Sequence, residues 1–233
     1  MPPLLRPLLT GLAGLVITVA AALPAHANEA IRKAVESKLD TKVEKITKTD
    51  YLGLYEVFAE GQIFYTDEKA SAFFLGTLID AKTMHNVTGK RLFAMLPLEL
   101  AVKQVRGNGK ATLVTFEDPN CGYCKRLAKD LLKLKDATIY TFMIPILSED
   151  SAEKAKAIWC SADKVKAWND WMVDNKAPGS KKDCGAPIDK LAALGQRFQV
   201  TGTPTLLFAD GSRVPGAVPL AQIEQKLAQI EKK

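Results

Sequence analysis

The chain has 233 residues, of which 47% are hydrophobic and 25% charged, and its formal net charge is +6. The basic residues are spread along the chain and interleaved with acidic ones, so a solvated surface accounts for the charge and nucleic-acid binding is not expected. The four cysteines are an even number, as in exported proteins that form disulfides.

The first 27 residues are typical of a secretory signal. Arg6 is their lone charge, residues 8–23 are apolar, and residues 25–27 match the A-x-A cleavage site. A membrane anchor is the alternative, but polar and helix-breaking residues interrupt a stretch that is already short for a membrane span. We therefore predict cleavage before Asn28 and export. Removing 27 of the 233 residues leaves 206, enough for two modest domains.

Residues 28–88 are expected to form an N-terminal domain with one helix and a small antiparallel sheet. Apolar residues recur at helical spacing from Ile31 to Leu39. Strands are predicted over 51–58, 62–66, 72–80 and 86–88, with the hairpin signal Glu60-Gly61 between the first two. A domain of about 60 residues has a thin core, so pairing with a second copy would stabilise it.

Residues 89–105 are predicted to form a helical linker. Apolar residues recur from Leu92 to Val105, and Pro97 interrupts the pattern because its nitrogen cannot donate to the preceding turn. We expect a helix that is kinked or restarted there. The polar segment 106–110 then predicts a turn, and the second domain is expected to span 106–233.

The second domain has the predicted order strand, helix, strand, three helices, hairpin, helix. Ser148 ahead of two acidic residues is a helix start signal, and we assign the three tryptophans to the core of the helical segment. The expected elements in chain order are a strand at 113–116, a helix at 124–134, a strand at 137–146, three helices between 151 and 198, strands at 205–209 and from 214, and a helix at 220–230.

Cys121-Gly122-Tyr123-Cys124 lies where the first of these strands meets the following helix. The free N–H groups of a first helical turn and the positive end of the helix dipole stabilise a thiolate, so Cys121 is the predicted nucleophile. Cys124 follows one turn later, within reach of a mixed disulfide on Cys121. The motif therefore predicts thiol–disulfide exchange.

Two alternatives compete with this interpretation. A zinc site needs four ligands, but no second Cys or His pair exists, and His85 is the one histidine outside the predicted leader. We therefore expect no metal. A purely structural disulfide between Cys121 and Cys124 is the second alternative, and the downstream sequence argues against it.

Thr203-Pro204 directly precedes the last predicted hairpin. A proline there marks an edge strand by default. Together with the Cys-x-x-Cys at the first strand–helix junction, however, this order of elements resembles the thioredoxin fold, in which the proline is cis and lies against the active-site sulfurs. The resemblance implies that the Thr203 backbone can pair with an extended substrate chain held beside Cys121.

The likeness covers essentially the whole chain after the leader. The motif 121–124, the segment 157–160 with Cys184, the segment 201–204 and a small helix-plus-sheet domain on a helical linker resemble the DsbC/DsbG family of periplasmic disulfide isomerases. The Gly122-Tyr123 dipeptide is nearer to the DsbC type. The resemblance implies an α+β N-terminal domain of cystatin-like form that pairs two chains, and a C-terminal α/β domain of thioredoxin-like fold with a helical insertion.

The resemblance also implies the activity and partners. Cys121 would attack mispaired disulfides of exported proteins in the periplasm, without a cofactor, and a membrane protein of the DsbD type would keep the motif reduced. Cys160 and Cys184 would form a structural disulfide, which we favour over a second redox site because neither has a Cys-x-x-Cys neighbour. The alternatives are a DsbG-like reductase of single oxidised cysteines and a mainly non-catalytic chaperone.

One position differs from thioredoxin itself. Thioredoxin has a buried Asp six residues before its first active-site cysteine, where this chain has Thr115. Glu117, Asp118 or solvent must then accept the proton of Cys124. Alternatively, Glu117 and Asp118 are ordinary surface acids ahead of Pro119, and the sequence favours this alternative.

Overall fold

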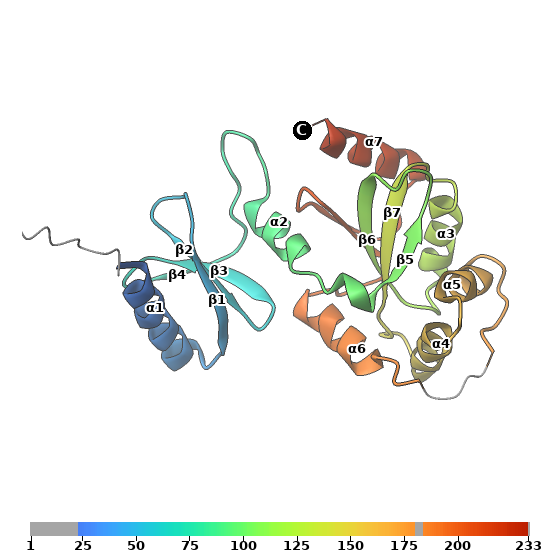
Figure 1. Ribbon diagram of the computed structural model, residues 1–233, viewed down its shortest axis with the longest axis horizontal. Coiled ribbons are helices and arrows are strands. Elements are labelled where there is room, and N and C mark those ends of the chain that lie inside the picture. Colours follow the sequence, from blue (N-terminus) through green and yellow to red (C-terminus); the bar gives the residue numbers. More distant parts are fainter. Residues whose placement is uncertain (1–22, 180–183, 233) are drawn as a thin grey trace, which may run out of the picture.

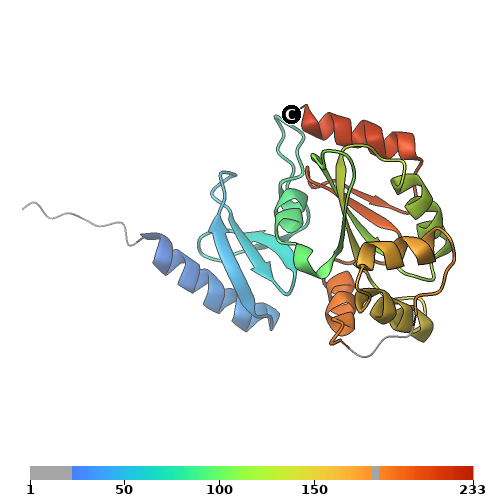
Figure 2. The same ribbon diagram turned by 45° about the vertical axis from the view of Figure 1, so that its right-hand side comes forward.

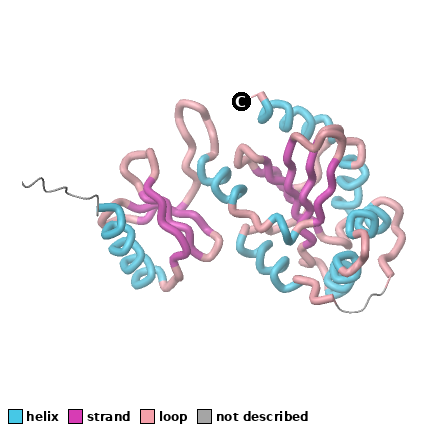
Figure 3. Tube along the Cα trace, viewed as in Figure 1, coloured by secondary structure: helices cyan, strands magenta, loops and turns pink. Residues whose placement is uncertain are grey.

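The computed structural model describes residues 23–179 and 184–232. Most of the predicted leader, residues 1–22, lies outside these described residues. The chain forms two lobes with one β-sheet each, joined through the helix α2, Val87–Ala94 (Figure 1). The tube view in Figure 3 separates the two groups of strands. The predicted cleavage segment 25–27 lies inside the first helix, α1 (Leu23–Leu39).

The N-terminal lobe is one helix packed on a four-stranded antiparallel sheet, which confirms the predicted fold of this region. The sheet order is β1-β2-β3-β4, and the core between sheet and helix includes Ile31, Val35, Val57 and Phe64. The Glu60-Gly61 hairpin joins β2 to β3 as predicted. The strands are β1 (Val43–Lys48), β2 (Tyr55–Ala59), β3 (Gln62–Thr66) and β4 (Phe73–Leu75).

Two strand predictions in this lobe were wrong, and one strand was missed. The run 72–80 forms only the short strand β4, with an isolated bridge at Ile79. Residues 86–88 do not form a strand, because the Asn86 side chain accepts the Gly89 N–H at 2.7 Å and caps α2 (Val87–Ala94). The missed strand is β1, in which charged residues separate the few apolar ones.

The predicted helix through Val105 was also wrong. After α2 the chain makes a single 3₁₀ turn, η1 (Leu98–Leu100), and then forms β5 (Val102–Val105). This strand pairs antiparallel with β7 (Ala137–Met143). Pro97 ends the helical pattern because it cannot donate a hydrogen bond. Residues 102–105 therefore belong to the C-terminal sheet.

The C-terminal lobe has a five-stranded sheet of order β5-β7-β6-β8-β9, in which only β6 and β7 run parallel. Alternate residues of β6 enter opposite cores: Leu113 packs with α3 and α7, and Val114 packs with α6. Helices thus cover both faces. The elements are β6 (Ala111–Glu117), α3 (Gly122–Leu131), β7 (Ala137–Met143), α6 (Ile188–Arg197), β8 (Thr205–Phe208), β9 (Arg213–Pro215) and α7 (Leu220–Glu231).

A helical insertion, α4 (Glu149–Trp159) and α5 (Lys164–Met172), packs beside α3. Ser148 caps α4 by accepting the Ser151 N–H, as predicted. Of the three tryptophans assigned to this core, only Trp168 is buried. Trp159 and Trp171 are partly buried, and the ammonium groups of Lys164 and Lys125 lie 3.4 and 3.7 Å from their ring centres.

Candidate active site

Cys121 is the residue that caps the N-terminus of α3. Its sulfur accepts the backbone N–H of Cys124 at 3.1 Å, so the first turn of the helix donates directly to it. Both residues are free thiols; Cys121 is 5% exposed and Cys124 fully buried. A sulfur at the positive end of a helix, with an N–H directed at it, is favoured as a thiolate.

The Thr203–Pro204 loop lies against the same sulfur. The Cys121 Sγ is 3.4 Å from the Thr203 carbonyl oxygen, although the two residues are 82 positions apart in the chain. The Thr203–Pro204 peptide bond is cis, Pro204 is buried, and Thr203 is half-buried. The fold therefore brings together the Cys-x-x-Cys and Thr-Pro motifs that the sequence singled out separately.

Glu117 is buried beneath the motif, at the end of β6. Its Oε1 accepts a hydrogen bond from the Thr115 hydroxyl at 2.7 Å, whereas its Oε2 has no partner among the described residues. Burial raises the pKa of Glu117 to about 7, and the hydrogen bond from Thr115 partly opposes that rise. Because Thr115 and Glu117 are two residues apart on one strand, they share a face of the sheet.

Glu117 and Cys124 interact electrostatically. Burial is the main cause that raises the pKa of the Cys124 thiol, and the Glu117 carboxylate and the hydrogen bond with Cys121 raise it further. Ionising Cys124 thus requires that a nearby group take up its proton. The ionisation of Cys124 is therefore coupled to that of Glu117.

Asp118 is also fully buried, but all of its hydrogen-bonding capacity is used locally. Its Oδ1 accepts from the Asn120 N–H at 2.7 Å and the Ser151 hydroxyl at 2.8 Å. Its Oδ2 accepts the N–H groups of Ile146 and Leu147 at 2.9 and 3.0 Å. The alternative that Glu117 and Asp118 are surface acids was therefore wrong; one is a buried acid with a free oxygen, and the other an anchor of the active-site loop.

Comparisons with known proteins agree with this geometry. Residues 20–89 match the family model described as disulfide bond isomerase protein N-terminal domain, and residues 98–231 match the thioredoxin-like domain. The probable thiol:disulfide interchange protein DsbC of Bordetella avium is 44% identical over 214 residues, which are 88% of this chain and 76% of that protein. The chain belongs to the DsbC family of thiol:disulfide interchange proteins. The resemblance predicted from the sequence is confirmed.

More distant DsbC relatives and a solved structure extend the match. Thiol:disulfide interchange protein DsbC of Escherichia coli K12 is 28% identical over 217 residues, covering 89% of this chain and 91% of that protein. The crystal structure of a disulfide interchange protein from Neisseria gonorrhoeae is 42% identical with a TM-score of 0.55, and the match covers 57% of this chain and 97% of that one. The chain is accordingly a thiol–disulfide oxidoreductase of thioredoxin-like fold.

The dipeptide between the two cysteines lies at the surface. Gly122 is exposed, and a Cβ built on it would meet nothing within 4 Å. The Tyr123 side chain is 60% exposed, and the Arg126 guanidinium lies 4.3 Å from its ring centre. Tyr123 thus offers an aromatic surface next to the buried Cys121 sulfur.

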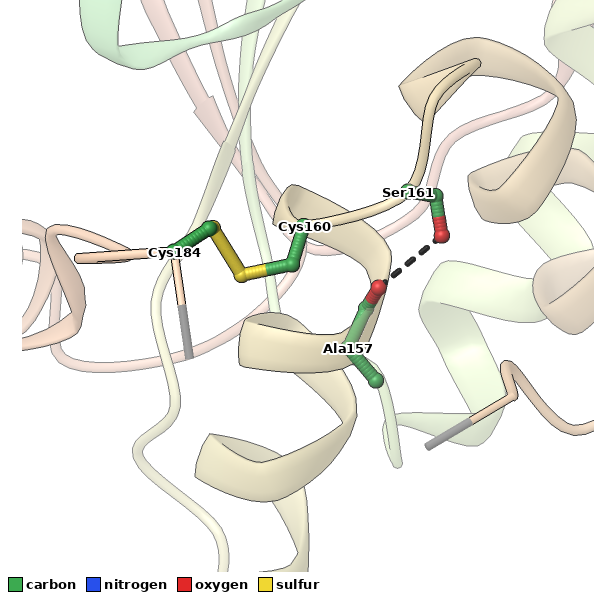
Figure 4. Close-up of a disulfide and its surroundings, with 4 residues drawn as sticks. All are labelled: Ala157, Cys160, Ser161 and Cys184. Atoms are coloured by element: carbon green, nitrogen blue, oxygen red, sulfur yellow. Dashed lines mark hydrogen bonds between the residues drawn. A yellow bond between two sulfur atoms is a disulfide. The ribbon is translucent and has the colours of Figure 1, made fainter. Parts of the chain in front are cut away.

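Cys160 and Cys184 are joined by a disulfide (Figure 4). Cys160 is the C-cap of α4, and the adjacent Ser161 hydroxyl donates to the Ala157 carbonyl at 2.9 Å, as Figure 4 shows. The bond ties the end of α4 to the exposed segment that precedes α6.

Residues 23–179 and 184–232 contain neither a metal-ligand cluster nor a candidate membrane-spanning helix. No three His, Cys, Asp or Glu side chains gather there as a metal site would require. No helix in the same residues combines the length and apolar character needed to cross a membrane.

Proposed function

We propose that the protein is a periplasmic disulfide isomerase that acts through Cys121. The observation that carries this proposal is the position of the Cys121 sulfur, which accepts the Cys124 N–H at 3.1 Å and lies 3.4 Å from the Thr203 carbonyl. The thiolate attacks one sulfur of a mispaired disulfide, and the other substrate sulfur leaves as a thiolate. That thiolate then attacks a different disulfide, and a final exchange returns Cys121 to its reduced form.

Cys124 is the resolving residue in this scheme. When a mixed disulfide persists, the Cys124 thiolate attacks the Cys121 sulfur, the substrate leaves as a thiolate, and Cys121 and Cys124 become oxidised together. Two electrons must then be returned to the pair. We propose a membrane donor of the DsbD type for that step.

Glu117 is the proposed acceptor of the Cys124 proton. Two observations support it: the acid is buried with its pKa raised to about 7, and its Oε2 has no hydrogen-bond partner in the described part of the chain. An acid with a pKa near neutrality is well matched to proton transfer at physiological pH. Asp118 is a poor competitor because both of its oxygens already accept two hydrogen bonds.

Thr203 and Pro204 are proposed to bind the substrate backbone. The Thr203 carbonyl lies beside the Cys121 sulfur, so an extended peptide paired with this loop would place its own disulfide against the nucleophile. The exposed ring of Tyr123 would contact apolar side chains of the same peptide.

The compartment, the assembly and the domain division are further parts of the proposal. We propose that cleavage before Asn28 releases the chain to the periplasm, and that the domain over 28–88 pairs two copies. Because β5 lies in the catalytic sheet, the linker is proposed to end at Pro97. The relatives at 44–45% identity carry DsbC names, so the DsbG-like reductase and the non-catalytic chaperone are not favoured.

The direct test compares recovery of a scrambled, multiply disulfide-bonded protein with simple oxidation of its reduced form. We expect the wild-type protein to accelerate recovery, Cys121→Ala to abolish the effect, and Cys124→Ala to accumulate covalent complexes on a non-reducing gel. Unchanged recovery with Cys121→Ala would overturn the proposal in favour of binding alone. Absence of complexes with Cys124→Ala would remove the two-thiol scheme.

A further inference from the structure

Arg197, at the end of the catalytic-domain helix α6, reaches the N-terminal sheet. Its Nη2 lies 2.8 Å from each carboxylate oxygen of Glu44 on β1, 153 residues away in the chain. The guanidinium also lies 4.9 Å from the ring centre of Phe58 on β2. An ion pair over an aromatic ring therefore joins two elements of different domains.

The side chain of Arg197 also packs against the β2–β3 turn. A Cβ built on Gly61 would lie 1.6 Å from the Arg197 Cγ, so only glycine leaves room for this arginine. Gly61 additionally has a φ of +81°, which favours glycine for the turn itself. Gly61 is thus needed both for the hairpin turn and for the contact between the domains.

A second contact between the domains lies on α2. The Asn86 Nδ2 donates to the Gly211 carbonyl at 3.2 Å, in the turn between β8 and β9. A Cβ on Gly89 would lie 2.1 Å from that same carbonyl oxygen. The two backbones approach so closely that they admit no side chain at Gly89 without a shift.

The helix α2 is itself fixed to the N-terminal sheet. The Arg91 Nε lies 3.1 and 3.3 Å from the oxygens of the buried Glu56, and Thr88 contacts the Tyr65 hydroxyl. The Thr88 hydroxyl oxygen also accepts the Leu78 N–H at 2.8 Å. Since α2 is bonded to the N-terminal sheet, its contact with Gly211 links the two domains.

The interface between the two domains is not filled. Figure 2 shows α2 between the N-terminal sheet and the catalytic lobe. A cavity of about 280 Å³ lies between the domains, and Gly61, Ile63, Leu92, Arg197, Phe198 and Arg213 are among the residues that line it. A cavity supplies no packing, so the orientation of the domains depends on the direct contacts that remain, namely the apolar packing of Leu92 and Phe93 on the catalytic core and the two polar contacts.

We propose that Arg197 is a positioning residue, which through Glu44 and Phe58 holds the Cys121 face at a fixed angle to the N-terminal sheet. This inference rests on the proposed isomerase function. Reshuffling a large substrate requires that the nucleophile stay aligned with the surface that holds the substrate, whereas reduction of a small disulfide needs only the catalytic domain. Loss of Arg197 should therefore impair the first activity and spare the second.

The test uses the full-length protein with Arg197→Ala, and Lys166→Ala as the matched control. The control removes an ion pair between Lys166 and Asp170 that lies within one helix. We expect Arg197→Ala to slow recovery of a scrambled protein about fivefold, the weight of one partly exposed ion pair, and to leave reduction of a small peptide disulfide unchanged. The control should change neither rate.

A charge swap and a distance measurement complete the test. Glu44→Arg combined with Arg197→Glu should restore recovery toward the wild-type rate. Probes at exposed Lys33 and Lys129, attached through unnatural amino acids to spare the cysteines, should show a broader inter-domain distance distribution in Arg197→Ala. An unchanged distribution, an ineffective swap, or an equal loss of both activities would overturn the inference. Wild-type protein that fails to isomerise would instead overturn the proposed function, and the distances would still decide the role of Arg197.

Discussion

Each of the two cysteine pairs has one member that caps a helix, and the two caps lie at opposite ends. Cys121 caps the N-terminus of α3 and accepts an N–H, while Cys160 caps the C-terminus of α4, where carbonyl groups gather. The helix dipole favours a negative sulfur at the first position and disfavours it at the second. Helix position thus suits Cys121 to the exchange proposed for it, whereas Cys160 forms a crosslink with Cys184.

Selective alkylation tests most directly whether the two cysteine pairs differ in reactivity. In the presence of mild reductant at neutral pH, we expect iodoacetamide to modify Cys121 completely, while Cys160 and Cys184 remain joined. Mass spectrometry of the digested protein would measure this. Equal modification of all four cysteines would show that helix position does not separate the two pairs.

A second prediction concerns the proposed attack of Cys124 on a mixed disulfide at Cys121. We expect Glu117→Gln to slow release of a preformed mixed disulfide about a hundredfold, since the amide cannot accept the Cys124 proton. The rate should also lose its dependence on pH near 7, which stopped-flow measurements across pH would detect. Asp118→Asn is the companion variant, and it should disturb the loop without removing that dependence. A Glu117→Gln rate equal to wild type would assign the proton to solvent.

The Cys160–Cys184 disulfide is expected to affect stability and not exchange activity. Replacing both Cys160 and Cys184 by Ala should lower the free energy of unfolding by roughly 3 kcal/mol, because the bond closes a loop across a sequence separation of 24. Denaturant unfolding measures this change. The double variant should keep its exchange activity with a small peptide, and a parallel loss of that activity would mean that the second pair takes part in catalysis.

The smallest expected effect is a pH dependence of stability. The native pKa of Glu117 is raised to about 7 from 4.5, so over this interval the folded protein holds a proton that the unfolded chain releases. Stability therefore falls as pH rises, by about 2 kcal/mol between about pH 5 and pH 7. Glu117→Gln should lack this slope in urea unfolding series. An identical slope in both proteins would mean that other groups cause it.

Local signals predicted the parts of the fold that short segments decide. The Glu60-Gly61 hairpin, the Ser148 cap and the junction that carries Cys121 all depend on a few neighbouring residues, and the structure has each of them. Segments decided by distant contacts were missed. β1 is recognisable only by its pairing with β2, and β5 only by its place beside β7.

The buried acids show the same limit at the site. From the sequence, Glu117 and Asp118 differ little from surface acids ahead of a proline. What distinguishes them is their surroundings: Thr115 on the same strand face for one, and the backbone of Ile146 and Leu147 for the other. A clue was present in the strand itself, since Glu117 directly follows the run 113–116 and, like those four residues, is buried in β6.

The Asp118 carboxylate gathers the active-site loop, the connection after β7 and the first turn of α4 around one point. The helix α4 is therefore held at both ends. Asp118 accepts a hydrogen bond from Ser151 in its first turn, and the disulfide lies at its C-cap, Cys160. Reducing the crosslink should therefore loosen α4 only at its C-terminal end. The hydrogen bonds of Asp118 contain no sulfur, so the end of α4 nearest Cys121 should stay held in either oxidation state of Cys160 and Cys184.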